Sequence, residues 1–576
     1  YSHNVANLET VEDAVRIAKF EQKNWSETKP QKIYEIFGNV AKNMENDRAR
    51  IIAAMIRDSG KTIEEANIEV SEAIDFARLY GLTALESNED SQPFGLVVVA
   101  SPWNFPYAIP AGGIIAALVS GNTVIFKPAP EVVLVGWELV NQLWKSGIPK
   151  QALHFVPTLD NEVGQKLVSH QDVDKVVLTG AYETAVKFKS WRPNLDLVAE
   201  TSGKNSIVVT NSSDIDLAVY DIVKSAFGHA GQKCSAASLA IVEKETYDNP
   251  LFFRQIVDAT NSLSVGNPTD LGNSVAPIIK NPDEKLLRAL TELEEGEEWL
   301  VKPKILNNSN CWRPGIKINV QPNSWTHMNE WFGPVLGIMK APNLKKAIEW
   351  QNATDYGLTA GLHSLSTKEC NYWLKNVEAG NLYINRPITG AVVKRQPFGG
   401  WKKSSFGPTV KAGSSFYPNV FKRYDEVKDY DMLVNGLQEL WNIKSKKIKN
   451  DDLQSEDNYS VLYPHKKVLI VQDKKPDPEF KKYLDSIKNI FRLTIDEIEF
   501  SQLEDKDLMD KYSLVRWLSR EPAPEWVYKH NFSLDTNHIV QNPQRELFSW
   551  VREQSVSITN HRYGNVGFSP VSIEVL

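Results

Sequence analysis

The sequence is poor in cysteine, and the cysteines show no pairing pattern. Cys234, Cys311 and Cys370 are the only three in 576 residues, and they lie far apart. Secreted disulfide frameworks use cysteines in even numbers, so this pattern predicts free thiols in a reducing compartment, and we expect a cytoplasmic protein. The ten histidines form no HxxxH or HExxH pair and no cysteine lies near another, so no metal site is predicted.

A surplus of positive charge is also missing. Lys and Arg number 65 against 72 Asp and Glu, which gives a net charge of −7. This balance argues against broad electrostatic binding to nucleic acid or to an anionic membrane. A small-molecule substrate is the better expectation.

One long stretch, from Ser91 to Phe126, lacks charge altogether, and its second part is long enough to cross a bilayer. It contains four prolines, four glycines and the amides Asn104 and Asn122. These groups would be costly in lipid, because a bilayer offers no partners for exposed polar groups. We therefore expect buried protein core here and no membrane span.

The period of the apolar residues changes along the chain. The first 80 residues have helical patterns, with Thr62 and Glu65 forming a capping box at one helix start. From Leu96 onward, short apolar runs alternate with helical segments, as buried parallel strands require. The strands are expected at 96–101, 123–126, 175–178 and 206–209, and the helices at 109–119 and 215–227. This alternation predicts an α/β protein with a doubly wound sheet.

The composition of the chain changes beyond about Tyr430. A Lys-rich run at 444–450 and the polar run after it predict a linker. A strand at 468–471, a helix at 476–491 and a strand at 493–498 then suggest one more βαβ unit. Its first strand is not followed by G-x-G-x-x-G, so we interpret this extension as structural and without a nucleotide motif.

Three side chains are candidates for chemistry. Cys234 follows a helical run in FGHAGQKCSAAS, Glu200 ends an apolar strand in LVAETSGKN, and Asn104 follows a buried strand in SPWNFP. A thiol, a carboxylate and an amide can act as nucleophile, general base and oxyanion donor. Taken singly, each also has an ordinary structural explanation, as a buried thiol, a strand-end charge and a turn residue.

Seven motifs occur in order along the chain: PWNFP, FKPAP, TGAYETA, ETSGKN, GQKCSA, EWFGPV and QPFGG. With Glu200 placed 34 residues before Cys234, this series resembles the aldehyde dehydrogenase superfamily from about residue 10 to 425. The resemblance implies an aldehyde dehydrogenase-like fold, with a Rossmann-type NAD domain beside an α/β catalytic domain. The expected divisions are 1–204 for the N-terminal helices and NAD domain, 205–400 for the catalytic domain, 401–430 for a returning segment that oligomerises, and 431–576 for the linker and a C-terminal Rossmann-like α/β extension.

The resemblance also implies a covalent mechanism. Cys234 attacks an aldehyde, while the Asn104 amide and the backbone N–H of Cys234 hold the oxyanion. Hydride transfer to NAD leaves a thioester, and Glu200 activates the water that hydrolyses it.

Four further positions match the cofactor motifs of the family. Lys127 is expected at the adenosine ribose, Gly180 at the phosphate turn, Glu330 at the nicotinamide ribose and Phe332 near the ring. Ala181 stands where the family often has Ser, so backbone N–H groups must carry more of the phosphate contact. NAD is favoured over NADP, because no Arg lies close by in the motif to receive a 2′-phosphate.

The run INRPITGAVVKRQPFGG, with AETSGKN and HAGQKCSAAS, resembles the L-glutamate γ-semialdehyde (1-pyrroline-5-carboxylate) dehydrogenases, including the catalytic part of bifunctional proline utilization A. The resemblance implies that Ser235, Gly390 and Ala391 bind the substrate α-carboxylate, and that Phe105 and Phe398 flank its aliphatic part. The expected reaction is NAD-dependent oxidation to L-glutamate in proline catabolism.

Two other functions stay open at this point. The chain could oxidise another aldehyde, such as succinic semialdehyde, or keep the fold without catalysis. The resemblance also implies a proline dehydrogenase partner, either a domain preceding Tyr1 or a separate protein, and a homo-oligomer formed by strand exchange after Gly400.

Overall fold

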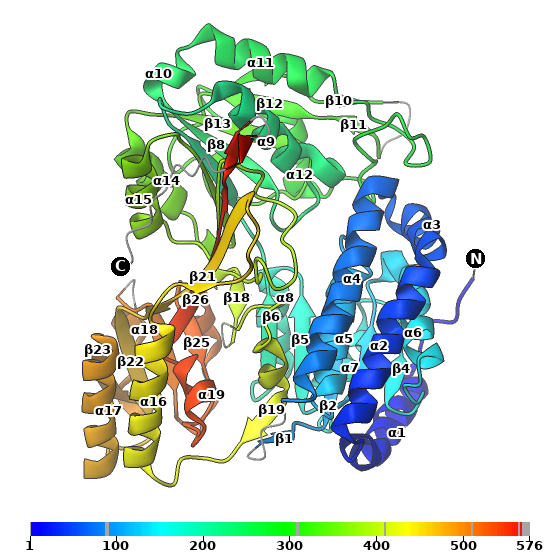
Figure 1. Cartoon of the computed structure of the whole chain (residues 1–576), viewed down its shortest axis with the longest axis vertical. Helices are drawn as coiled ribbons and strands as arrows, with labels where there is room; N and C mark the ends of the chain where they lie inside the picture. The colour runs from blue at the N-terminus through cyan, green and yellow to red at the C-terminus, as the bar shows by residue number, and fades with distance from the viewer. Residues whose placement is uncertain are drawn as a thin grey trace.

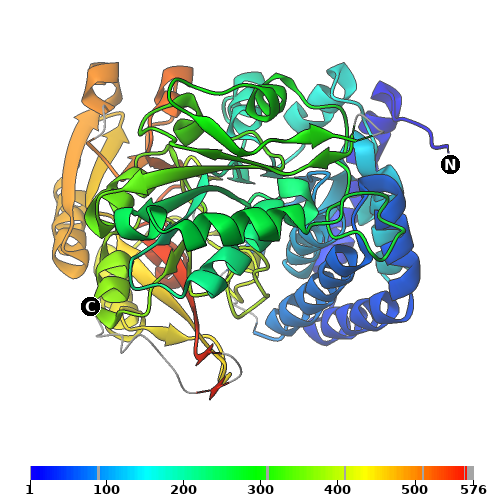
Figure 2. The same ribbon diagram turned by 90° about the horizontal axis from the view of Figure 1, so that it is seen from above.

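The computed structural model describes residues 2–86, 91–306, 310–407, 410–508, 511–562 and 565–566 of the chain. Three large sheets organise it, one with six strands, one with ten and one with four. Figure 1 shows the six-stranded sheet behind the N-terminal helices, the ten-stranded sheet above it and the four-stranded sheet at the lower left. The four-stranded sheet and the helices that cover it are called the C-terminal unit below. In Figure 2 this unit and the N-terminal helices lie on opposite sides of the molecule.

Four helices open the chain, as the periodicity predicts: α1 (Leu8–Ser26), α2 (Pro30–Asn46), α3 (Arg48–Ser59) and α4 (Ile63–Thr83). Thr62 caps α4 by accepting the N–H of Glu65 at 3.4 Å. The Glu65 carboxylate does not complete the expected capping box, because it pairs with Lys233 at 2.7 Å. Helix α4 is thereby tied to the loop that carries Cys234.

The six-stranded sheet is parallel except for its short edge strand β18, and its order is β18-β6-β5-β2-β3-β4. Its strands are β2 (Leu96–Ala100), β3 (Thr123–Lys127), β4 (Leu153–Phe155), β5 (Lys175–Thr179), β6 (Leu197–Glu200) and β18 (Ser405–Phe406). The helices between them are α5 (Ala108–Val119), α6 (Val133–Lys145), α7 (Glu162–Ser169) and α8 (Tyr182–Trp191). The predicted α/β fold and its strands are confirmed.

The uncharged stretch lies in the middle of this sheet. Strand β2 is buried along its whole length, because Val97 and Val99 pack into one core and Leu96 and Val98 into the core on the opposite face. A strand covered by helices on both faces needs apolar residues at every position. Among the described residues, no helix combines the length and the apolar character of a membrane span.

The ten-stranded sheet runs in the order β20-β21-β26-β16-β15-β7-β8-β13-β12-β9, and its strands from β26 to β12 are parallel. These strands are β7 (Asn205–Val209), β8 (Ala237–Glu243), β9 (Glu298–Val301), β12 (Gly315–Ile318), β13 (Val335–Ala341), β15 (Thr359–His363), β16 (Asn381–Ile384), β20 (Ile448–Lys449), β21 (Glu456–Pro464) and β26 (Val551–Thr559). Its main helices are α9 (Ile215–Phe227), α11 (Pro250–Asn261), α14 (Leu344–Asn352) and α15 (Thr367–Asn376).

The segment after residue 430 contributes to two sheets. Strands β20, β21 and β26 extend the ten-stranded sheet, with β26 parallel to β16. Between β21 and β26 the chain forms the all-parallel four-stranded sheet β23-β22-β24-β25. Its strands are β22 (Lys467–Gln472), β23 (Thr494–Glu499), β24 (Leu514–Trp517) and β25 (Ser533–Asp535), and its helices are α16 (Tyr430–Lys444), α17 (Pro478–Phe491) and α19 (Pro543–Leu547).

The four-stranded sheet packs against the six-stranded one. The Phe406 ring of β18 stacks on Tyr528 with a centroid separation of 5.3 Å. The hydroxyl of Tyr182, at the start of α8, donates to the backbone oxygen of Tyr528 at 2.8 Å. The polar run expected as a linker contains β20 and leads directly into β21.

A buried ion cluster holds the C-terminal unit together. The Arg516 guanidinium on β24 is fully buried and donates to the Glu546 carboxylate, with Asp535 at 3.8 Å as a second acidic neighbour. Tyr483 and Trp550 also donate to Glu546, at 3.1 and 2.9 Å. Removing one partner of such a pair leaves an uncompensated charge in the core.

We therefore expect Glu546→Ala to destabilise this unit by about 3 kcal/mol or more, because the Arg516 charge loses its main partner. The urea midpoint followed by tryptophan fluorescence measures the loss. Glu525→Ala, at an exposed position, is the matched control and should leave the midpoint in place. Equal midpoints for both variants would contradict this account.

Candidate active site

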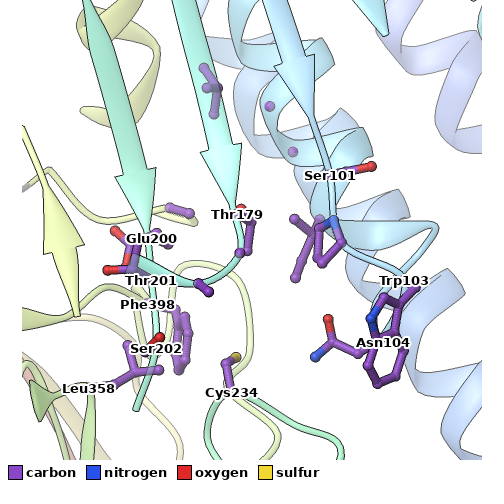
Figure 3. A pocket seen from close by; sticks show the side chains of 18 of the residues that line it. Ser101, Trp103, Asn104, Thr179, Glu200, Thr201, Ser202, Cys234, Leu358 and Phe398 are labelled. Carbon is purple, nitrogen blue, oxygen red and sulfur yellow. The ribbon is translucent and has the colours of Figure 1, made fainter. Parts of the chain in front are cut away.

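A cavity of about 410 Å³ opens at the carboxyl ends of β2, β5 and β6. Parallel strands of an open sheet collect ligands at this edge. Asn104, Glu200 and Cys234, which lie far apart in the sequence, all line it. Figure 3 shows Asn104 and Cys234 facing each other across the cavity.

The turn before Cys234 has an unusual backbone. After α9 ends at Phe227, His229, Ala230 and Gly231 take positive φ angles of 51°, 54° and 70°. A side chain at Gly231 would begin 2.3 Å from the carbonyl oxygen of Gly333. Only glycine fits this contact, which packs the Cys234 turn against the loop that carries Glu330.

Asn104 is oriented by the same turn. Its side-chain amide donates to the backbone oxygen of Gln232 at 3.2 Å, and the residue is buried. An amide nitrogen has two N–H groups, so one remains for a substrate oxygen. The geometry therefore permits the expected oxyanion contact.

The Glu200 carboxylate lies on the other side of Cys234 from Asn104, and it points away from the thiol (Figure 3). It accepts the N–H of Gly400 at 3.1 Å. Burial raises the pKa of Glu200 to about 8, against which the Gly400 hydrogen bond and Lys411 act only in part. To reach a water next to Cys234, this side chain must rotate.

Burial also raises the pKa of the Cys234 thiol to about 12, with Glu330, Glu200 and Glu72 adding to the effect. The thiolate is the reactive form of cysteine. In this state the thiol is protonated at neutral pH, so a nearby positive charge or a base is needed to activate it.

One short segment connects the two sheets and contacts the cysteine directly. The Asn205 side chain donates to the backbone oxygens of Cys234 at 2.7 Å and Ala236 at 3.0 Å. The N–H of Gly203 donates to the Glu330 carboxylate at 2.9 Å. Burial raises the pKa of Glu330 to about 7.

The residues at the strand ends fit a dinucleotide. Gly180 lines the cavity, and Ala181 begins α8 without a side-chain cap, which leaves backbone N–H groups for a phosphate. The hydroxyls of Ser101 and Thr158, which follow β2 and β4, are buried and have no partner among the described residues. A ligand with hydroxyl and phosphate groups would supply those partners.

Two of the other expected cofactor residues, Glu330 and Phe332, also line the cavity. Lys127 does not. It ends β3 at the same sheet edge, where its ammonium pairs with the exposed Asp160 at 3.1 Å.

Of the five residues expected to bind the substrate, some line the cavity and others do not. Ala391 and Phe398 line the cavity. Gly390 precedes Ala391 at a positive φ of 84°, and a side chain there would meet open space. Ser235 is buried next to Cys234. Phe105 lies outside the lining, where its ring centre is 3.8 Å from the Lys61 ammonium.

Sequence reasoning missed Glu72, which lines the cavity from α4. Burial raises its pKa to about 8, and Glu69 adds to the effect. Glu65, Glu69 and Glu72 follow helical spacing and so lie along one face of α4. That spacing was visible in the sequence, but it is also typical of a solvated helix face.

Comparison with known proteins agrees with this geometry. The model of the aldehyde dehydrogenase family matches residues 2–428. The 1-pyrroline-5-carboxylate dehydrogenase of Geobacillus sp. (strain WCH70) is 35% identical over 436 residues, which cover 72% of this chain and 84% of that protein. The corresponding enzyme of Geobacillus thermodenitrificans (strain NG80-2) is likewise 35% identical over 436 residues, with the same coverage.

Solved structures show the same relationship. Proline utilization A (PutA) from Corynebacterium freiburgense is 40% identical with a TM-score of 0.89, and the match covers 98% of this chain but only 60% of that protein. The 1-pyrroline-5-carboxylate dehydrogenase from Thermus with bound NAD is 30% identical with a TM-score of 0.68, covering 73% of this chain and 85% of that one. The chain therefore belongs to the aldehyde dehydrogenase family.

Proposed function

We propose that this chain oxidises L-glutamate γ-semialdehyde, the open form of 1-pyrroline-5-carboxylate, to L-glutamate with NAD. The observation that carries the proposal is the convergence of Cys234, Asn104 and Glu200 on one cavity, in a chain whose relatives at 35% identity are 1-pyrroline-5-carboxylate dehydrogenases. The Thermus relative binds NAD, and the strand-end residues here fit that group.

In this proposal Cys234 is the nucleophile. The thiol loses its proton to water, and the thiolate sulfur then bonds to the aldehyde carbon. The free N–H of Asn104 and the backbone N–H of Cys234 stabilise the resulting oxyanion. When bound, NAD supplies the hydride acceptor that converts the adduct into a thioester. Glu200 then takes a proton from water, whose oxygen attacks the thioester carbon and releases the acid and the Cys234 thiol.

Lys127, Gly180, Glu330 and Phe332 hold the cofactor in this proposal. Gly180 and the start of α8 would receive the phosphates, and the Glu330 carboxylate would accept hydrogen bonds from a ribose. Rotation of Lys127 away from the exposed Asp160 would free its ammonium for the other ribose.

The amino-acid end of the substrate meets complementary groups. The backbone N–H groups of Gly390 and Ala391 make no hydrogen bond among the described residues, so they are free for a carboxylate, with the Ser235 hydroxyl as a further donor. The Glu72 carboxylate is suited to the α-ammonium group. Phe398 lines the cavity and would pack against the aliphatic carbons, whereas the Phe105 ring lies under the Lys61 ammonium.

The partner proposals follow from the same comparisons. A proline dehydrogenase, on the same polypeptide or separate, would supply the substrate, since the C. freiburgense protein extends well beyond the matched part. The three free cysteines support a cytoplasmic location. A homo-oligomer would need a surface other than the β16 edge, because β26 of the same chain covers it.

The first test measures NADH absorbance with 1-pyrroline-5-carboxylate, succinic semialdehyde and propionaldehyde as substrates. We expect the highest kcat/KM for the first and no turnover in Cys234→Ala. Cys370→Ala, a buried thiol outside the cavity, is the matched control and should retain activity. A preference for succinic semialdehyde would favour the alternative substrate, and no turnover of any aldehyde would refute the proposal.

The role proposed for Glu200 implies that the rate of thioester hydrolysis depends on pH. Its pKa of about 8 means that the base is increasingly protonated as pH falls below that value, so thioester hydrolysis should slow in proportion. Glu200→Gln should keep a burst of one NADH per Cys234 and lose later turnover by about 100-fold or more. Rapid-mixing kinetics separate the burst from turnover. Loss of the burst together with turnover would contradict this assignment.

The role proposed for Glu72 implies that the enzyme prefers aldehydes that carry an α-ammonium group. Glu72→Gln removes a carboxyl group that an approaching α-ammonium group would ionise and pair with, so kcat/KM should fall about tenfold for L-glutamate γ-semialdehyde and stay nearly constant for propionaldehyde. Steady-state kinetics with both substrates checks this. Equal losses for the two aldehydes would indicate a structural role for Glu72 instead.

A further inference from the structure

A second cavity of about 530 Å³ lies between the six-stranded sheet and the C-terminal unit. It shares no lining residue with the catalytic cavity. Its volume falls within the range of small-molecule sites in proteins. The mechanism proposed above makes no use of it.

The position of this cavity is that of a ligand site in an α/β sheet. Strands β24 and β25 of the four-stranded sheet end at Trp517 and Asp535, and the residues just after them line the cavity. Asn537 and His538 are among these residues. Ligands of parallel sheets bind at the carboxyl ends of the strands, so the C-terminal unit presents its binding edge here.

The opposite wall comes from the six-stranded sheet and is cationic. Lys175, the first residue of β5, is buried and pairs with Asp196 at 2.5 Å. Lys189 is also buried, and its ammonium donates to the backbone oxygen of Leu195 at 2.9 Å. Burial lowers the pKa of Lys189 to about 8, and the attraction of the nearby Asp196 opposes this shift only in part.

Two further cations meet this wall from other segments. Lys422 is half-buried and has no ion pair among the described residues. Nη1 of Arg545, on α19, is buried and has no hydrogen-bond partner in the described chain. Arg545 also lies close enough to Lys175 to lower the pKa of that lysine. Like charges therefore face each other across the interface.

The acidic residues around the cavity neutralise this charge only in part, although Asp196 pairs with Lys175 and the buried Asp535 lies near Arg545. The Glu546 carboxylate already accepts hydrogen bonds from Arg516, Tyr483 and Trp550. Glu426 and Glu521 are exposed at the rim and form no ion pair with another described residue. The remaining rim cations are Arg423, which pairs with Asp174 at 3.1 Å, and the exposed Arg520.

We propose that this cavity binds a small anion carrying phosphate or carboxylate groups, held by Arg545, Lys422 and Lys189. An anion at this point would bond the unpartnered guanidinium nitrogen and offset the facing cations. The C-terminal sheet has no glycine loop, so a compact anion suits the cavity better than a dinucleotide. Bound there, the anion would bridge the two sheets.

Calorimetric titration of the full chain with inorganic phosphate, and separately with citrate, tests the site at an ionic strength held constant with chloride. We expect saturable binding of at least one probe, and the probe that binds identifies the site as phosphate-selective, carboxylate-selective or general. Arg545→Gln and Lys422→Gln should each weaken binding about tenfold, through loss of a charged hydrogen bond.

Arg254→Gln makes the same charge change on the exposed face of α11 and should bind like wild type. NADH formation should stay at the wild-type level in all three variants, which shows that they are folded. Absence of saturable binding to the wild type would overturn the proposal. Unchanged affinity in both Arg545→Gln and Lys422→Gln would also overturn it, because the anion would then bind elsewhere.

Discussion

The hydrogen bonds of the Asn205 side chain are the constraint on which the site depends. They fix the Cys234 and Ala236 carbonyls at 2.7 and 3.0 Å, and Asn205 Oδ1 accepts the N–H of Thr359 at 3.0 Å. Asn205 starts the first strand of the ten-stranded sheet, only a few residues after Glu200 ends its strand in the six-stranded sheet. This connection therefore constrains how Glu200 and Cys234 lie relative to the carboxyl ends of the six-stranded sheet.

Burial of acidic groups sets the electrostatics of the cavity. Burial raises the pKa values of Glu72 and Glu200 to about 8 and that of Glu330 to about 7. It also raises the pKa of the Cys234 thiol, to about 12. Each shift arises because a charged form loses water that the protein does not replace. Such a cavity favours ligands that bring positive charge, as both a nicotinamide ring and an α-ammonium group do.

The C-terminal segment is part of the same folded body. Strand β26 extends the ten-stranded sheet at β16, while the four-stranded sheet packs on β18 through Phe406 and Tyr528. The Geobacillus relatives align over 72% of this chain, whereas the C. freiburgense structure aligns over 98%. This segment covers a sheet edge with main-chain hydrogen bonds and forms the cationic cavity against the six-stranded sheet.

The sequence by itself determined the α/β class, the strands around the uncharged stretch and the identity of Cys234, Glu200 and Asn104 as candidates, because strand periodicity and ordered motifs are local properties. Only the tertiary structure decided that Glu65 pairs with Lys233, that Glu72 faces the cavity and that Phe105 does not. It also decided that β26 joins β16 across more than 160 residues. Burial and long-range pairing depend on which surfaces meet, and no local pattern encodes that.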